Sequence, residues 1–261
     1  MKRRWQWTGG VVLVLAAAAM FLWHPWHRVS LEEASFVFPG APGVTPPPAL
    51  SDVMVVLYSG DGGWSDLDQG LGKALVDRGV PVYGISSFKY FWRPQGPDVT
   101  GPELDEMVAE YLARWHKRRV LMVGFSFGAD VVPSILAKAS PATRAAIAQI
   151  VLLSPSRDVN FEIEMEDYMV ANWFTTKTRL LTEWLHPIAH YPAVPPLAAL
   201  AGKPPVACYF GKEQQDESLC TAPDLPRWIV VHPMPGTHHF DANYPALAAR
   251  MVADFPRVGR P

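Results

Sequence analysis

Short runs that are apolar almost throughout alternate along this chain with segments of helical periodicity. The apolar runs cover residues 53–59, 81–87, 119–126, 149–156, 205–211 and 228–234, and the helical segments cover 67–77, 103–116, 127–139 and 244–254. A strand that is apolar on both faces must be covered on both faces, as happens in parallel sheets whose crossover helices pack on either side. The sequence therefore predicts an α/β fold with a mostly parallel sheet between helices.

Length and charge narrow the class of protein further. The chain has 261 residues, of which 49% are hydrophobic, so it can bury one sizeable core. Its formal net charge is −2 and its sequence pI is about 6.4. Because no basic surface is implied, nucleic acid is not an expected partner.

The N-terminus differs in composition from the rest of the chain. Basic residues at positions 2–4 precede an apolar run at 11–23, flanked by tryptophans and glycines. The stretch approaches the roughly 20 residues that span a bilayer, and positive charge before it favours a cytoplasmic N-terminus. We expect residues 1–26 to anchor the protein in the inner membrane, with a cleaved signal peptide as the alternative. Either way, the rest of the chain is expected in the periplasm.

The remainder divides into a linker and one domain. Residues 27–50 are rich in proline and glycine and are expected to form a linker before a domain at 51–261. Residues 157–203 lie between two predicted strands and are rich in aromatic residues. They are expected to form a cap inserted over one end of the sheet.

The chain has two cysteines, Cys208 and Cys220. In an exported protein such a pair is a candidate disulfide. Two buried free thiols are the alternative.

Ser126 lies in the sequence Gly124-Phe-Ser-Phe-Gly128, between a predicted strand and a predicted helix. The pattern G-x-S-x-G in this context is typical of a sharp strand-to-helix turn that exposes a nucleophilic serine above the sheet. A glycine-flanked turn that only packs a helix tightly is the alternative.

A serine nucleophile needs a base and an acid, which in such folds follow later strands in the order serine, acid, histidine. The loop after the strand 205–211 offers Glu213, Asp216 and Glu217. Asp216 is preferred because it lies centrally in the loop, between the two cysteines.

The histidine is expected after the last strand, where "PMPGTHHFD" offers His238 and His239. Comparison with the G-H-F-F run common in hydrolases of this kind favours His238, with His239 as the alternative.

Backbone N–H groups that stabilise an oxyanion are expected from two places. One is Phe127, directly after the serine. The other is the glycine-rich loop 58–64, at Asp61 or Gly62, where glycine lets the backbone approach a substrate closely. No lysine follows this loop, so a phosphate-binding P-loop is excluded.

No metal or other cofactor is expected. His186 and His190 are four residues apart, but Pro187 between them would break the helix that metal ligation at this spacing needs.

Five separated segments, in order, resemble the VirJ/AcvB family of exported bacterial α/β-hydrolases. They are "YSGDGGW", "SFKYFW", "VGFSFGADVVP", "FEIEM" and "PGTHHFD", and the resemblance covers residues 50–255. It implies an α/β-hydrolase fold and a periplasmic serine hydrolase that removes lysine or alanine from aminoacyl-phosphatidylglycerol. It also implies a triad of Ser126, Asp216 and His238 or His239, and a link to secretion systems in some members.

Such a substrate carries a cationic amine beside the ester, so acidic residues near the serine would bind it. Asp61, Glu162 and Glu164 are the candidates, and Trp64 is assigned to substrate binding with them. A solvated surface is the alternative for the acidic run at 161–167.

Two other functions remain open. One is a general exported esterase or lipase. The other is a non-catalytic periplasmic adaptor that contacts secretion-system components through the aromatic-rich region 157–203.

Overall fold

The computed structural model describes residues 28–164 and 187–256. The predicted anchor at 1–26 and the middle of the predicted cap therefore lie outside the described residues. Within the described ranges, no helix is both long and apolar enough to cross a membrane.

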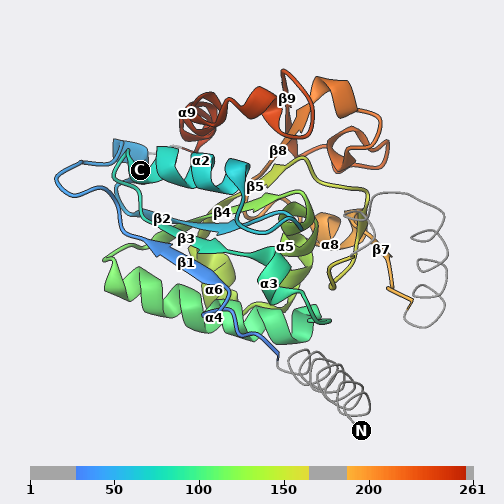
Figure 1. The fold of residues 1–261 in the computed structure, drawn as a ribbon, viewed down its shortest axis with the longest axis horizontal. Helices are drawn as coiled ribbons and strands as arrows, with labels where there is room; N and C mark the ends of the chain where they lie inside the picture. The colour runs from blue at the N-terminus through green and yellow to red at the C-terminus, as the bar shows by residue number, and fades with distance from the viewer. Residues whose placement is uncertain (1–27, 165–186, 257–261) are drawn as a thin grey trace, which may run out of the picture.

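A seven-stranded sheet forms the centre of the domain (Figure 1). Its first strand is antiparallel to its neighbour and all other pairs are parallel. In spatial order the strands are β1 (Ser35–Phe38), β3 (Val82–Ile85), β2 (Val53–Tyr58), β4 (Arg119–Phe125), β5 (Ile147–Leu153), β8 (Val206–Gly211) and β9 (Val230–Met234). The six predicted strands are confirmed, as is the mostly parallel sheet.

Helices cover both faces of this sheet, as Figure 1 shows. On one face α2 (Asp66–Val76) packs beside α9 (Tyr244–Asp254), and on the other α4 (Pro97–Arg114) packs against α5 (Phe127–Lys138). The shorter helices α3 (Ser87–Tyr90) and α6 (Pro141–Ala146) complete the second face. Helix α4 begins six residues before the predicted start at 103, because Pro97 occupies its first turn, where a proline costs no hydrogen bond.

Alternate residues of β2 explain why its sequence is apolar throughout. Val53, Val55 and Leu57 are buried in the core under α2 and α9. Met54 and Val56 are buried in the core under α4 and α5. Each such side chain contributes about 1.5–3 kcal/mol on full burial, so the strand is stabilised from both sides.

The predicted linker at 27–50 is partly wrong, because residues 35–38 form strand β1. This strand pairs with β3 as an antiparallel edge. The surrounding proline and glycine residues dominate the composition of the segment and hide a four-residue strand within it.

The described parts of the predicted cap form a small base beside the sheet. Strand β6 (Asp158–Val159) pairs with β7 (Tyr191–Pro192), and α8 (Val194–Ala199) packs on α5. The two ends of the 157–203 segment are thereby held together at the mouth of the domain.

Candidate active site

Ser126 lies at the turn between β4 and α5 with φ 51° and ψ −122°. A positive φ is strained for a residue with a side chain. A Cβ on Gly124 would lie 2.6 Å from the Cα of Ala129, and one on Gly128 would lie 2.6 Å from the carbonyl oxygen of Ser59. Both flanking positions therefore require glycine, and the turn has the geometry that the G-x-S-x-G pattern predicts.

Two backbone N–H groups near Ser126 are candidate oxyanion donors. The N–H of Phe127 has no acceptor among the described residues, and neither has the N–H of Asp61. The N–H of Gly62 instead donates to the carboxylate of Asp61 at 2.9 Å. Phe127 and Asp61 are thus free to bind an oxyanion, whereas Gly62 is already occupied.

The loop that carries Asp61 lies against the serine. A Cβ on Gly60 would lie 3.5 Å from the Cβ of Ser126. Asp61 and Phe127 both line the cavity into which Ser126 opens.

Both candidate histidines lie next to the strand that carries the serine. The rings of His238 and His239 are 5.1 Å and 5.3 Å from the ring of Phe125. His238 is half-buried and lines a cavity, while His239 is exposed. Among the described residues, Ser126 forms no side-chain hydrogen bond to either imidazole.

Burial lowers the pKa of His238 below its ordinary value. The charge of His239 acts in the same direction, and Asp61 and Glu217 oppose it. His238 is therefore neutral at pH 7, which is the form that accepts a proton. These features favour His238 over His239 as the base.

Within the acid loop, Glu217 and Asp216 differ in their relation to His238. Both acids are exposed, but Glu217 lines the cavity that also holds His238 and Asp216 does not. Glu217 also acts electrostatically on His238 and Asp216 does not contribute. The shared cavity and the electrostatic effect favour Glu217 over Asp216 as the partner of the imidazole.

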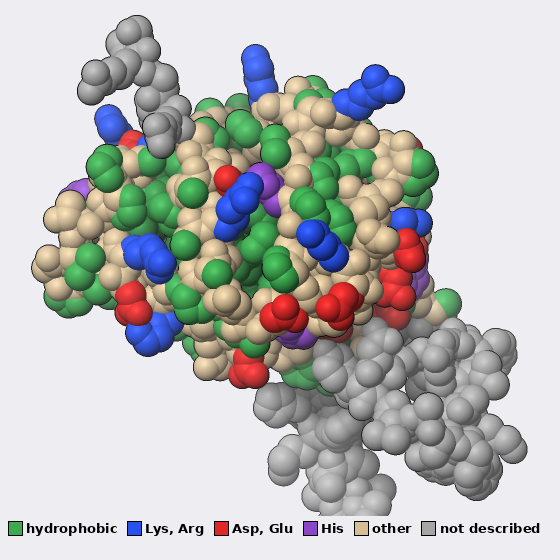
Figure 2. Space-filling model, turned by 90° about the horizontal axis from the view of Figure 1, so that it is seen from above, with side chains coloured by type: hydrophobic (Ala, Val, Ile, Leu, Met, Phe, Trp, Pro, Cys, Tyr) green, Lys and Arg blue, Asp and Glu red, His purple; other side chains and the backbone are tan. Residues whose placement is uncertain are grey.

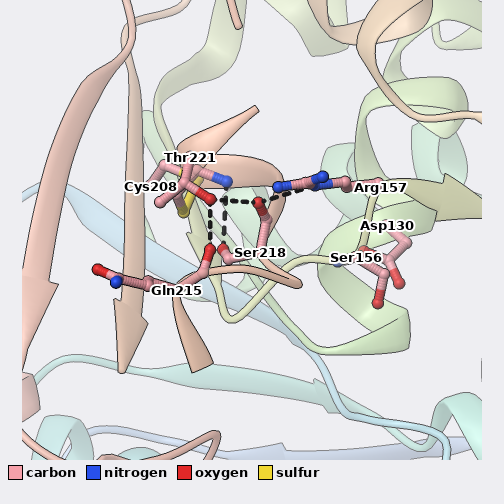
Figure 3. The surroundings of a disulfide bond; sticks show 8 residues. Asp130, Ser156, Arg157, Cys208, Gln215, Ser218 and Thr221 are labelled. Carbon is pink, nitrogen blue, oxygen red and sulfur yellow. Dashed lines mark hydrogen bonds between the residues drawn. A yellow bond between two sulfur atoms is a disulfide. The ribbon is translucent and has the colours of Figure 1, made fainter. Parts of the chain in front are cut away.

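The predicted disulfide between Cys208 and Cys220 is present and fixes this loop at both ends. Within the loop, the Thr221 hydroxyl donates to the Ser218 carbonyl at 2.9 Å, and the Ser218 hydroxyl accepts from the Cys220 N–H at 3.2 Å (Figure 3). The Leu219 N–H donates to the Pro155 carbonyl at 2.9 Å, which ties the loop to the end of β5. The disulfide and these hydrogen bonds together fix the backbone that follows Glu217.

The cavity beside Ser126 is acidic and has a volume of about 240 Å³. Its lining residues are Asp61, Ser126, Phe127, Asp130, Ser156, Asp158, Asn160, Glu164 and His190. On a larger scale, acidic side chains gather along one margin of the face that carries α9 and β9, while lysines and arginines are spread over the rest of it (Figure 2).

Asp130 was not identified from the sequence, although it is the most buried acid of this cavity. It lies one helical turn after Ser126 on α5 and its carboxylate accepts from the Ser156 N–H at 2.7 Å. Burial raises its pKa to about 8, against the opposing effect of Ser156 and with further contributions from Asp61 and Asp158. The sequence feature that could have identified Asp130 is its position as the one acid within an otherwise largely apolar helical stretch.

Of the predicted substrate-binding residues, Glu164 lies in the cavity. It accepts from the Asn160 amide at 2.5 Å and pairs with His190 at 2.8 Å. Glu162 does not line the cavity.

Trp64, predicted to bind substrate, does not line the cavity beside Ser126. Its ring stacks on Phe36 and Phe38, with centroids 5.3 Å and 5.8 Å away. It also covers Gly84, where a Cβ would lie 2.9 Å from a ring carbon. Trp64 therefore fills the space between α2 and the β1 edge rather than facing Ser126.

No group of three or more potential metal ligands occurs among the residues that the structure describes. His186, one member of the histidine pair considered above, lies outside them. Its partner His190 contacts Glu164 instead.

Comparisons with known proteins agree with this architecture. Residues 52–258 match the model of a family described as "Bacterial virulence protein (VirJ)". An esterase domain from Rhodothermus marinus aligns with a TM-score of 0.50 and 11% identity, covering 85% of this chain and 97% of that one. A soluble variant of monoglyceride lipase from Saccharomyces cerevisiae aligns with a TM-score of 0.50 and 9% identity, covering 85% and 92%. No curated protein matches the sequence significantly. The domain has the α/β-hydrolase fold.

Proposed function

The chain belongs to the VirJ family of bacterial virulence proteins, and from that premise we propose that it is a serine hydrolase of aminoacyl-phosphatidylglycerol. It would act at the periplasmic face of the inner membrane, to which its N-terminal segment anchors it. The observation that carries the proposal is the position of Ser126, in a strained turn that opens into an acidic cavity.

The reaction requires the Ser126 hydroxyl and the His238 imidazole to come within hydrogen-bonding distance of each other. The Ser126 hydroxyl attacks the ester carbonyl carbon while the neutral imidazole of His238 takes its proton. The N–H groups of Phe127 and Asp61 stabilise the oxyanion, and loss of one such donor in a hydrolase costs about 3–4 kcal/mol.

Collapse of this intermediate breaks the bond to the glycerol oxygen. The His238 imidazolium returns the proton to that oxygen, so that phosphatidylglycerol leaves and the aminoacyl group stays on Ser126. Water, activated by the same imidazole, then hydrolyses the acyl-enzyme and releases the free amino acid. Glu217 stabilises the imidazolium in both steps.

The acidic cavity supports an aminoacyl rather than a fatty acyl group. The α-amine of an aminoacyl ester is cationic and lies one carbon from the scissile carbonyl. Asp61, Asp158 and Glu164 line the cavity around Ser126 and would attract this ammonium. A fatty acyl chain would gain nothing from them, and it would have to desolvate charged groups at a cost.

The test compares Ser126→Ala with wild type on two esters presented in detergent micelles, alanyl-phosphatidylglycerol and a diacylglycerol. We expect wild type to hydrolyse the aminoacyl ester at a much higher kcat/KM, and Ser126→Ala to lose roughly 1,000-fold or more of it. Ser51→Ala, an exposed serine far from the cavity, is the matched control.

Equal turnover of both esters would contradict the aminoacyl assignment and favour a general esterase. Unchanged turnover in Ser126→Ala would contradict the serine mechanism. Full biological activity of Ser126→Ala would instead support an adaptor that contacts secretion-system components.

A further inference from the structure

The first described residue after the N-terminal segment is bound tightly to the domain. The Arg28 guanidinium donates to the Gln95 side-chain oxygen at 2.5 Å and forms an ion pair with Glu103 on α4. The Leu31 N–H donates to the same glutamate at 3.2 Å. Figure 1 shows the described chain beginning beside α4 and near α3.

Gln95 connects this attachment point to the wall of the cavity. It is 1% exposed, and its side-chain amide donates to the Val29 carbonyl at 3.2 Å. Its own N–H donates to the Phe161 carbonyl at 3.0 Å. Phe161 adjoins Asn160, which lines the cavity beside Ser126. The start of the domain and the active-site mouth are therefore neighbours.

Exposed apolar side chains border this connection. Trp92 and Val99 lie on either side of Gln95 in sequence and are 39% and 36% exposed. Tyr191 is 53% exposed, and its ring lies 6.3 Å from that of Phe161. Val99 lies four residues before Glu103 on α4, on the face that binds Arg28. We call Trp92, Val99 and Tyr191 the mouth rim.

The length of the preceding chain limits how far the mouth rim can lie from a membrane. The apolar run ends at Trp23, five residues before Arg28. Five extended residues span at most about 17 Å. If the run crosses the bilayer, Arg28 lies within that distance of the membrane surface, and the mouth rim lies on the elements to which Arg28 and Gln95 are bound.

We propose that the mouth rim is the surface on which the domain rests on the phosphatidylglycerol-containing bilayer, with the active-site mouth facing the lipid. The inference rests on the proposed anchor and deepens the proposed function. Tryptophan and tyrosine side chains are favoured at the membrane interface because one end of each is apolar and the other polar.

The decisive experiment measures membrane contact without using catalysis. The full chain is reconstituted into vesicles of phosphatidylethanolamine and phosphatidylglycerol with a single fluorophore on Val99→Cys, Tyr191→Cys or Val230→Cys. The two natural cysteines are paired, so the new thiol reacts alone. Val230, 56% exposed on edge strand β9, is the matched control.

Lipids with a head-group quencher should reduce emission at positions 99 and 191 and leave it intact at 230. Equal quenching at all three positions, or none at 99 and 191, would overturn the proposal. If the fluorophores at positions 99 and 191 become protected only when another protein is added, and not by lipid, the mouth rim would be assigned to a protein partner. That result would also overturn the proposal.

A second measurement separates docking from catalysis. The double variant Trp92→Ser/Tyr191→Ser should lose about tenfold in hydrolysis of aminoacyl-phosphatidylglycerol in vesicles, because two aromatic contacts are lost. Its hydrolysis of a water-soluble alanine ester should equal that of Val230→Ser, and an equal loss on both substrates would contradict docking. If wild type does not hydrolyse the lipid at all, the proposed function fails while the quenching result still decides the orientation.

Discussion

Replacing Asp130 by asparagine should change how stability depends on pH. Asp130 is 7% exposed, and its pKa in the folded protein is raised from 3.8 to about 8 by burial. In the unfolded chain the group releases its proton near pH 3.9. Between these values the folded state holds one more proton than the unfolded state, so the free energy of unfolding falls as pH rises.

The size of the effect follows from the width of that window. Each pH unit removes about 1.4 kcal/mol for one fully linked proton. The interval from about pH 4 to about pH 8 therefore sets a ceiling of roughly 5 kcal/mol on the contribution of Asp130. Asparagine keeps an oxygen that can accept from the Ser156 N–H but has no proton to release. Asp130→Asn should match wild type near pH 4 and exceed its stability progressively up to pH 8.

The assay is urea unfolding of the full chain in detergent at intervals between pH 4 and 9. The difference between Asp130→Asn and wild type isolates this one group from the histidines that titrate in the same range. Asp98→Asn, which removes an exposed acid paired with Lys138 at 2.7 Å, is the control and should change little with pH. Parallel curves for wild type and Asp130→Asn over pH 4–8 would refute the reasoning.

Three further predictions concern the site and its support. Glu217→Gln should lower kcat by roughly 100- to 10,000-fold while Asp216→Asn changes it little, since of these two acids only Glu217 lines the cavity with His238. Ester hydrolysis assays of both variants test this, and a larger loss in Asp216→Asn would assign the acid to Asp216. Gly128→Ala should lower the free energy of unfolding by about 1–3 kcal/mol, because its Cβ would press on backbone oxygens of β2 and the following loop; thermal unfolding tests this, and an unchanged midpoint would contradict it. Cys208→Ser/Cys220→Ser opens a loop with a sequence separation of 12 and should lower the free energy of unfolding by about 3 kcal/mol. Urea unfolding measures this loss, and an unchanged free energy would contradict the prediction.

The sequence predicted most of the architecture because apolar runs report burial directly. Strands such as β2 are apolar on both faces, and in the fold both faces are indeed covered. The turn at Ser126 was predictable for a similar reason. Its glycines are required by close backbone approach, and that requirement is local enough to appear as a motif.

Other features depend on packing that no local pattern reports. Asp216 and Glu217 are adjacent in sequence, and only the path of the chain after β8 decides which one faces the cavity. Trp64 directly follows the glycine-rich loop at the site, which suggested a role in substrate binding. Its ring instead stacks on aromatic residues of β1, a strand that the sequence did not predict. Asp130 lies on the predicted helix, but its burial includes a contact with Ser156, after β5, which the local sequence does not report.

The close backbone contacts divide the candidate catalytic groups into two sets, each held by its own contacts. Gly128 touches the end of β2, and Gly60 touches Ser126, so hydroxyl and oxyanion donors share one stiff block at the centre of the sheet. At the sheet margin, a Cβ on Gly211 would lie 2.6 Å from the Thr237 carbonyl carbon, which couples the acid-bearing loop to the imidazole-bearing one. The position of the imidazole relative to the hydroxyl therefore depends on both outer loops together.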